Sequence, residues 1–302
     1  MERWPSFKQL KHFAMLAEER HFGQAAERLK ITQSTLSASI RELELVLGAP
    51  VVDRAGKRVA LTPLGEEVLA RGEKILLQLD ELTRAARASA MPLTGTLRLG
   101  VIPTISPFLL PRLLPGLRHR YPLLKLFLRE DLTDNLMAQL HRGQLDLLLL
   151  ALPCACGSEE VHSLARDAFM VVLRKDHALA RAKGIKVAEL QKEKLLVLQD
   201  GHCLREQSLS ACRLKAPDDE AYAATSLHTL VQMVDNGLGL ALLPEMAVKA
   251  GILSGTQLLA KPVLDAPAWR DIAVIWRRGS ARAEEFRLLA GELGKLMGRR
   301  AS

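Results

Sequence analysis

Two cysteines nine residues apart carry the most distinctive chemistry in this sequence. Cys203 follows His202 at the expected start of a helix, and Cys212 stands at the expected end of that helix. Amide dipoles at a helix N-terminus favour a thiolate, and positive charge on His202 and Arg205 would favour it further. We therefore predict a lowered pKa for Cys203 and a thiolate that a peroxide readily oxidises to sulfenic acid.

The same spacing argues against a disulfide while the segment is helical. Over nine residues a helix rises ~13 Å and turns by steps of ~100°, so the two side chains lie on opposite faces. A disulfide needs its two Cα atoms within about 7 Å of each other. A bond between Cys203 and Cys212 therefore requires the helix to unwind, as in a redox switch that refolds a segment. The alternative is a pair of inert buried thiols, because cysteine is among the most buried residue types.

The other two cysteines belong to a Cys154-Ala155-Cys156 motif. Such a pair can supply two metal ligands, but no second pair with the spacing of a structural zinc site accompanies it. We expect no metal and no other cofactor, and we place both cysteines in a connecting loop, where they are alternative disulfide partners. Four cysteines in 302 residues are too few for a secreted disulfide scaffold, so we expect thiols in a reducing compartment.

The N-terminal residues predict a DNA-binding unit. Apolar residues at three- and four-residue steps predict helices over about 7–20, 23–30 and 33–47, with Thr32 as the cap of the third. Two helices joined by a short turn, the second polar at its N-terminal end, form a helix-turn-helix. In residues 51–61, apolar residues alternate with other residues on both sides of a basic turn that contains glycine. This pattern is typical of the hairpin in a winged domain.

Side chains with the chemistry for DNA recognition lie in two of these elements. Glutamine pairs with adenine, hydroxyls bond to bases or phosphates, and arginine or lysine reaches guanine or the backbone. The candidate DNA-binding residues are Gln33, Ser34, Thr35, Ser37 and Arg41 in the third helix and Arg54, Lys57 and Arg58 in the hairpin. From polarity alone, a solvated face on a small helical bundle is an equal alternative for the helix.

A long helix follows, with Thr62 as its cap and Pro63 in its first turn. Its apolar residues keep a heptad-like spacing over more than three turns, at Leu64, Val68, Ile75, Leu79, Leu82 and Ala86. Such a stripe predicts dimerisation, and packing against the protein's own core is the alternative. A dimer would hold two recognition helices about 34 Å apart, so its target would be an interrupted palindrome.

After residue 95 strands and helices alternate, which predicts parallel sheets covered by helices. The expected strands are 97–101, 124–128, 145–152, 169–173, 195–198, 238–243 and 271–276. The expected helices are one that begins at Ser106 and is kinked at Pro111 and Pro115, then 134–142, 187–190, 203–212, 226–235 and 282–297. Two small α/β lobes joined by crossing segments would form a ligand cleft between strand ends.

Charge does not localise a DNA-binding face. The net charge is +8, but residues 1–60 contribute only +3 of it, from 10 Lys/Arg and 7 Asp/Glu. An apolar run such as Leu147–Leu152 is far shorter than the ~20 residues of a membrane span, and the N-terminal residues lack the pattern of a signal peptide. We therefore expect a soluble, cytoplasmic protein with no membrane partner.

Together these motifs resemble the LysR-type transcriptional regulators. Residues 1–90 resemble the winged helix-turn-helix and linker helix of that family, and the remainder resembles its periplasmic-binding-protein-like effector domain. The resemblance implies an α+β multidomain chain that ends in two Rossmann-like α/β lobes. The family often has Ser-Gln-Pro where this chain has Thr32-Gln33-Ser34, which bears on the base preference rather than on the fold.

The implied division of the chain has four parts. They are a winged helix-turn-helix at 1–61, a linker and dimerisation helix at 62–90, a first regulatory lobe at 95–165 with 268–302, and a second lobe at 166–267. The second lobe carries Cys203 and Cys212.

The cysteine segment is similar to that of the peroxide sensors within this family. The similarity rests on Asp200–Arg205, on the nine-residue spacing, and on the stretches 100–111 and 133–140. It implies that Cys203 is the peroxidatic cysteine and Cys212 the resolving cysteine.

Four further residues are implied to support a peroxide site. By resemblance, Thr104 and Thr133 hydrogen-bond the peroxide and help to hold His202 and Cys203, and Arg205 also supports the site. Glu206 stands where those sensors commonly have Asp, and its longer side chain would change the reactivity without abolishing it.

The resemblance implies partners as well. They are double-stranded DNA with an interrupted palindrome, hydrogen peroxide as the signal, a second copy of the chain in a homodimer or homotetramer, RNA polymerase, and a thiol reductant of the glutaredoxin or thioredoxin type. On this interpretation the chain is a regulator and not an enzyme.

Two alternatives stay open. In one, a regulator of the same family binds a small organic effector between its lobes, and the cysteines are inert. In the other, a thiol enzyme uses His202 as base and Cys203 as nucleophile. Adjacent residues at a helix start point in different directions, and no third orienting residue can be assigned, so the enzyme is the weaker alternative.

Overall fold

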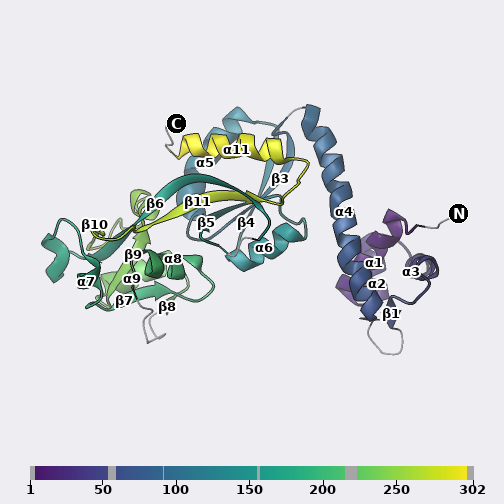
Figure 1. The fold of residues 1–302 in the computed structure, drawn as a ribbon, viewed down its shortest axis with the longest axis horizontal. Helices are drawn as coiled ribbons and strands as arrows, with labels where there is room; N and C mark the ends of the chain where they lie inside the picture. The colour runs from purple at the N-terminus through teal and green to yellow at the C-terminus, as the bar shows by residue number, and fades with distance from the viewer. Residues whose placement is uncertain (1–3, 54–58, 91, 155–156, 215–222, 298–302) are drawn as a thin grey trace. The chain divides into compact units, whose positions relative to one another are not determined.

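The computed structural model describes residues 4–53, 59–90, 92–154, 157–214 and 223–297. The chain divides into two compact units, residues 1–87 and residues 88–302 (Figure 1). The first unit has one hydrophobic core and the second has two.

The first unit consists of helices and a small hairpin. Its elements are α1 (Phe7–Glu19), α2 (Phe22–Leu29), α3 (Gln33–Leu47), β1 (Val52–Asp53), β2 (Ala60–Leu61) and α4 (Pro63–Ala90). Helix α3 begins where expected, because the Thr32 hydroxyl accepts a hydrogen bond from the amide of Thr35 (3.2 Å). It ends at Gly48, whose φ of +75° favours glycine. The hairpin is confirmed by the pairing of Val52 with Leu61.

The core of this unit fixes the orientation of α3. Leu36, Ile40 and Leu43 are buried together with Phe13 and Leu16 of α1. These three α3 residues recur at steps of four and three, so they share one face of the helix. The polar residues at the start of α3 are therefore left on the other face.

The base of the hairpin is held tightly against the start of α4. The Thr62 hydroxyl donates a hydrogen bond to the carbonyl oxygen of Pro50 (2.8 Å) and accepts one from the amide of Gly65 (3.0 Å). A Cβ atom at Gly65 would lie 2.1 Å from the carbonyl oxygen of Val51, so only glycine permits this approach.

A mixed nine-stranded sheet organises the second unit. Its strands are β3 (Gly95–Val101), β4 (Leu124–Glu130), β5 (Leu147–Leu152), β6 (Glu160–Arg174), β7 (Leu195–Leu198), β8 (Ala223–Ala224), β9 (Leu240–Pro244), β10 (Leu258–Pro262) and β11 (Trp269–Trp276). The strand order is β4-β3-β5-β11-β6-β9-β7-β8, and β10 pairs with β6. Strands β3, β4 and β5 are parallel, as are β7, β8 and β9. Strands β6 and β11 run antiparallel to their neighbours and join the two parallel sections.

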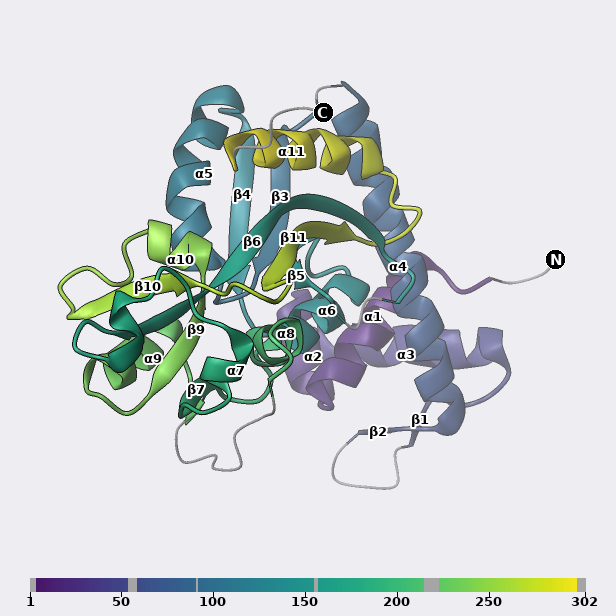
Figure 2. The ribbon, with the colours of Figure 1, turned by 60° about the vertical axis from the view of Figure 1, so that its left-hand side comes forward.

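Helices cover both sections of the sheet (Figures 1 and 2). They are α5 (Ser106–Arg120), α6 (Thr133–His141), α7 (Val187–Leu190), α8 (Cys203–Ala211), α9 (Leu227–Asp235), α10 (Glu245–Lys249) and α11 (Ala283–Leu296), with a 3₁₀ turn at Ala178–Arg181. Helix α8 contacts β5, β7 and β11, which places it where the two sections meet.

Two cores lie within this unit. The first core gathers buried residues of β3, β5, β11, α5, α6 and α11, such as Leu148, Val274 and Phe286. The second core gathers those of β6, β7, β9 and α9, such as Val172 and Leu242. This arrangement agrees with the expected two-lobed α/β class, whereas the proposed boundaries at 165/166 and 267/268 stay a prediction.

Several local expectations need correction. The sheet is mixed rather than parallel, because β6 and β11 cross between its two sections as antiparallel strands. Strand β6 begins at Glu160, nine residues before the predicted start at 169. The first half was not predicted as a strand because its residues are largely polar and half exposed. The expected helix from Ser106 runs to Arg120 with Pro111 and Pro115 inside it, and the kink at these prolines stays a prediction. The short elements β8, β10 and α10 were not predicted.

Candidate functional site

Cys203 is the first residue of α8, which is labelled in Figure 2, and side chains of this helix pack in both cores of the second unit. The half-buried Cys203 packs against the first core, whereas Leu204 and Cys212 belong to the second. Gly201, with φ +90°, provides the turn before the helix. A change in the conformation of α8 would therefore disturb both cores.

Burial raises the pKa of the Cys203 thiol above its ordinary value. Four weaker effects oppose it: the Thr133 hydroxyl, the positive charge of Arg270, and the backbone amides of Cys203 and Leu204. The amides confirm the expected effect of the helix N-terminus. The predicted lowered pKa is nevertheless wrong for the reduced protein, because the desolvation of a thiolate raises the pKa by more than these groups lower it.

Arg270 is the cation beside Cys203, and sequence reasoning did not find it. It stands on β11 and is 1% exposed. Its Nε donates to Asp167 Oδ2 (3.0 Å), and its Nη1 and Nη2 donate to the hydroxyl (2.9 Å) and carbonyl oxygen (3.0 Å) of Thr104. Asp167 also accepts from the amide of Met246 (2.9 Å), so the pair links β6, β11 and α10. An arginine at the edge of the apolar run 272–276 was the available signal.

Two predicted threonines reach the same site. Thr104 is buried and bound to Arg270, and Thr133, the first residue of α6, faces the Cys203 thiol. Thr133 Oγ1 lies near enough to the thiol to lower its pKa, but it is buried without a hydrogen bond of good geometry to any described group. A buried hydroxyl with spare hydrogen-bonding capacity beside a thiol suits a small polar ligand.

His202 and Arg205 do not supply the predicted positive charge. Burial lowers the pKa of His202, opposed by a hydrogen bond with the backbone of Thr225, so its ring is neutral near pH 7. Arg205 Nη1 instead pairs with Asp200 Oδ1 at 2.9 Å. The nearby positive charge that lowers the pKa of Cys203 comes from Arg270.

Cys212 is fully buried in the second core, and burial raises its pKa to about 11. Cys212 caps α8, and both it and Cys203 are free thiols. The expected helix between them is thus confirmed. Cys154 packs against the first core, and Cys156 lies outside the described residues.

The predicted DNA-binding face of α3 is available on the first unit. Gln33, Ser34, Thr35 and Arg41 are exposed and Ser37 is half-buried. The Thr32 hydroxyl contacts those of Ser34 (2.9 Å) and Thr35 (2.7 Å), which orders the start of the helix. Arg54, Lys57 and Arg58 lie outside the described residues.

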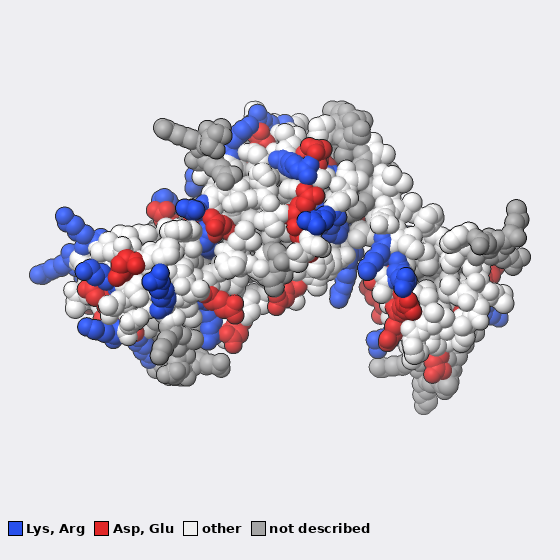
Figure 3. Space-filling model, viewed as in Figure 1, with Lys and Arg blue, Asp and Glu red and all other residues white. Residues whose placement is uncertain are grey.

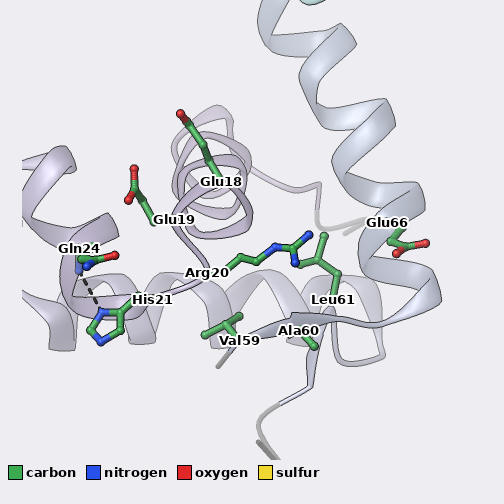
Figure 4. Close-up of a pocket in the computed structure, with 9 residues that line it drawn as sticks. All are labelled: Glu18, Glu19, Arg20, His21, Gln24, Val59, Ala60, Leu61 and Glu66. Carbon is green, nitrogen blue, oxygen red and sulfur yellow. Dashed lines mark hydrogen bonds between the residues drawn. The ribbon is translucent and has the colours of Figure 1, made fainter. Parts of the chain in front are cut away.

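A hollow of about 640 Å³ lies between the end of α1, the start of α2, the hairpin and α4 (Figure 4). Its lining includes Glu18, Glu19 and Glu66 as well as Arg20 and His21. His21 Nδ1 accepts hydrogen bonds from the amides of the second and third residues of α2. Three carboxylates beside one guanidinium do not suit a phosphate group.

Charged side chains of both signs are interspersed on the face of the molecule in Figure 3. Within residues 4–297, apart from the gaps given above, no cluster of three His, Cys, Asp or Glu side chains is arranged to hold a metal ion. Likewise, no helix among the described residues is long and apolar enough to cross a membrane.

Family models match both units of the chain. Residues 7–66 match the bacterial regulatory helix-turn-helix protein of the lysR family, and residues 91–297 match the LysR substrate binding domain. The chain belongs to the LysR family of transcriptional regulators. Members of this family are DNA-binding regulators and not enzymes, so the thiol-enzyme alternative is excluded.

Relatives within the family span nearly the whole chain. The transcriptional regulator EstR of Acinetobacter baylyi is 38% identical over 298 residues, which are 98% of each chain. A probable hydrogen peroxide-inducible genes activator of Streptomyces viridosporus is 39% identical over 297 residues, which are 98% of this chain and 95% of the relative.

Solved structures of OxyR share the fold. Full-length OxyR of Pseudomonas aeruginosa, a cysteine-to-aspartate variant, has a TM-score of 0.77 at 32% identity, covering 96% of this chain and 95% of that one. A cysteine-to-serine variant of Corynebacterium glutamicum OxyR in a hydrogen peroxide-bound form has a TM-score of 0.66 at 33% identity, covering 98% and 94%.

Proposed function

We propose that the chain is a peroxide-sensing transcriptional regulator whose signal is a reversible disulfide between Cys203 and Cys212. The observation that carries the proposal is the buried site in which the Cys203 thiol meets the spare hydroxyl of Thr133 and the positive charge of Arg270. A thiol, a hydrogen-bonding group and a fixed cation are the groups that the reduction of a peroxide requires. The similarity to OxyR structures and to peroxide-inducible activators supports the same function.

In the first step, the Cys203 thiolate attacks one oxygen of hydrogen peroxide, and the O–O bond breaks. The sulfur becomes a sulfenic acid, and the other oxygen leaves as hydroxide and takes up a proton to become water. Thr133 holds the peroxide by a hydrogen bond, and the charge of Arg270 stabilises the thiolate and the leaving hydroxide. Thr104 keeps the Arg270 guanidinium in place through its hydroxyl and carbonyl oxygens.

In the second step, the Cys212 thiolate attacks the Cys203 sulfur, the S–O bond breaks, and a second water is released. Helix α8 must unwind for this step, since its two ends are ~13 Å apart along the helix axis. Cys212 then leaves the second core, and the packing around α8 changes. A thiol reductant of the glutaredoxin or thioredoxin type supplies two electrons and restores both thiols.

The output of this switch is DNA binding through α3. We propose that Gln33 and Arg41 contact base edges or phosphates, and that Ser34, Thr35 and Ser37 support them. The chain acts in the cytoplasm as a homodimer or homotetramer joined through α4. It binds an interrupted palindrome and contacts RNA polymerase at the promoter.

Mass spectrometry after treatment with one equivalent of hydrogen peroxide tests the redox proposal. The wild type should lose the Cys203 and Cys212 thiols together, and Cys212→Ser should gain one oxygen at Cys203. Cys203→Ser is the matched control and should keep its Cys212 thiol. A wild type that retains both thiols would refute the proposal.

A second candidate is a regulator of the same family that binds a small organic effector, with inert cysteines. Two observations favour it: burial raises the pKa of both thiols, and the name of one similar relative, the transcriptional regulator EstR, does not mention peroxide. The discriminating experiment compares a promoter reporter in cells that carry the wild type or Cys203→Ser. A Cys203→Ser protein that still responds to peroxide would favour the second candidate.

A further inference from the structure

A buried amide ties α8 to the end of β5. Gln207 follows Cys203 by one helical turn, and its side chain is buried. Its Nε2 donates to the carbonyl oxygens of Ala151 (2.8 Å) and Pro153 (2.9 Å). Because carbonyl oxygens only accept hydrogen bonds, the amide nitrogen must face them. The Gln207 side chain therefore joins α8 by two donor contacts to the end of β5 and to the loop that follows it.

This tie opposes the movement that disulfide formation requires. Leu204 and Cys212 anchor α8 in the second core, and Gln207 anchors it to β5. Unwinding α8 withdraws the amide from two carbonyl oxygens, one of them buried. A buried acceptor that loses its donor costs more free energy than an exposed one, which water can satisfy. The Oε1 atom of Gln207 is buried without a hydrogen bond to a described residue, so the described contacts of this amide are those of its nitrogen.

We infer that Gln207 is a latch that keeps α8 helical and sets the rate at which Cys212 captures the Cys203 sulfenic acid. The inference rests on the proposed function, because the latch acts only after Cys203 is oxidised. Gln207 is a positioning residue, since its amide nitrogen contacts the backbone of β5 and of the loop that follows it. It should change the second step of the switch and leave the first unchanged.

The substitution Gln207→Met tests the latch, because it keeps the length and helix propensity of the side chain but removes its N–H groups. Disulfide closure is followed by rapid acid quench and mass spectrometry after a pulse of hydrogen peroxide. Sulfenic acid formation at Cys203 is measured separately in the Cys212→Ser background by trapping with a cyclic 1,3-dione. We expect closure to become about tenfold faster, which corresponds to about 1.4 kcal/mol of barrier, and trapping to proceed at the unaltered rate.

Ser210→Met is the matched control, because it places the same side chain at an exposed position of the same helix. Its closure rate should stay near that of the wild type. Gln207→Asn, whose amide is one methylene too short to reach both carbonyl oxygens, should also accelerate closure and serves as the second variant if Gln207→Met does not fold. Circular dichroism verifies the fold of each.

Closure that is unchanged or slower in the folded Gln207 variants, with normal trapping, would overturn the latch and leave the proposed function intact. Failure to trap any sulfenic acid in Cys212→Ser would overturn the proposed function instead. The two failures are therefore distinguishable within one set of proteins.

Discussion

The buried ion pair between Arg270 and Asp167 places a positive charge beside Cys203. Each member satisfies the other, and Thr104 and Met246 supply the remaining hydrogen bonds. A buried ion pair contributes little net stability, but removing one member leaves an uncompensated charge. The pair therefore has both a structural and a chemical consequence, which substitutions can separate.

Arg270→Met should lower the free energy of unfolding by about 3–5 kcal/mol, because Asp167 is left buried and charged. Adding Asp167→Asn removes that charge and keeps an acceptor for the Met246 amide, so part of the lost stability should return. The oxidation of Cys203 should stay slow in both variants, since each lacks the guanidinium. Urea unfolding and sulfenic acid trapping measure the two effects, and a double variant that recovers both would contradict the assigned role of Arg270.

The rate of Cys203 oxidation should rise with pH across the neutral range. Burial raises the pKa of this thiol above its ordinary value of about 8.5, so the reactive thiolate is a minority whose fraction grows about tenfold per pH unit. The measurement is the second-order rate of trapping in Cys212→Ser between about pH 6 and 8. A rate that is independent of pH would mean that Cys203 is already fully ionised over this range, as the lowered pKa expected from the sequence implies.

Sequence alone could reach only part of this site. Cys203 and Cys212 are visible from their type and spacing, and Thr104 and Thr133 follow from a family resemblance. Arg270 could not be placed, because its contact with Thr104 joins residues 166 positions apart. The raised pKa of Cys203 was missed for the same reason, since burial depends on segments that are distant in the chain.

At the scale of elements, local signals predicted best where the chain carries caps and breaks. Helix α3 follows from Thr32 and the terminating Gly48, and α8 starts at Cys203 as expected. The first half of β6 was missed because its half-exposed residues give no clear apolar alternation. Its pairing with β11 is what makes it a strand, and no local pattern records that pairing.

Helix α1 supports α3 through a buried histidine, which makes the first unit sensitive to acid. His12 Nδ1 lies 2.8 Å from the Ser39 hydroxyl, and burial, with smaller effects of Lys8 and Lys11, lowers the pKa of His12. The unfolded chain therefore binds more protons near pH 6, so stability should fall as the pH drops below about 6.5. His12→Asn, which can bond to Ser39 without titrating, should lose less stability between pH 7.5 and 5.5. Thermal unfolding at the two pH values tests this, and equal losses would assign the effect to other groups.

The face of α3 should separate base recognition from phosphate contact. Gln33→Ala should weaken the free energy of operator binding by about 1–3 kcal/mol and relax the specificity at one base pair, because the bidentate contact to adenine is lost. If Arg41 binds phosphate, Arg41→Ala should weaken all sequences alike and reduce the slope of log affinity against log salt by about 1. Titrations of operator and mutated operator DNA at several salt concentrations measure both. A uniform loss in Gln33→Ala would show that this residue does not read bases.

At the scale of the molecule, the stripe on α4 has two roles along its length. Leu64 and Val68 pack against the core of the first unit, whereas Ile75 is 42% and Leu82 is 64% exposed. The two interpretations of the stripe thus apply to different parts of it, since the early residues serve the chain's own core. The exposed later residues are the ones left for a partner helix.

Leu82→Glu should therefore weaken the dimer without unfolding the first unit. A carboxylate in an apolar helix seam costs desolvation energy and meets its own copy across the dimer axis, so both effects oppose association. Sedimentation should show a shift from dimer or tetramer toward monomer, and affinity for the interrupted palindrome should fall far more than affinity for one half-site, because only the paired recognition helices bind the two half-sites together. Thr83→Glu, at the neighbouring exposed position, is the control for added charge on α4. A Leu82→Glu protein that remains fully associated would mean that the dimer is built from other surfaces, and the spacing of its two α3 helices would then no longer follow from α4.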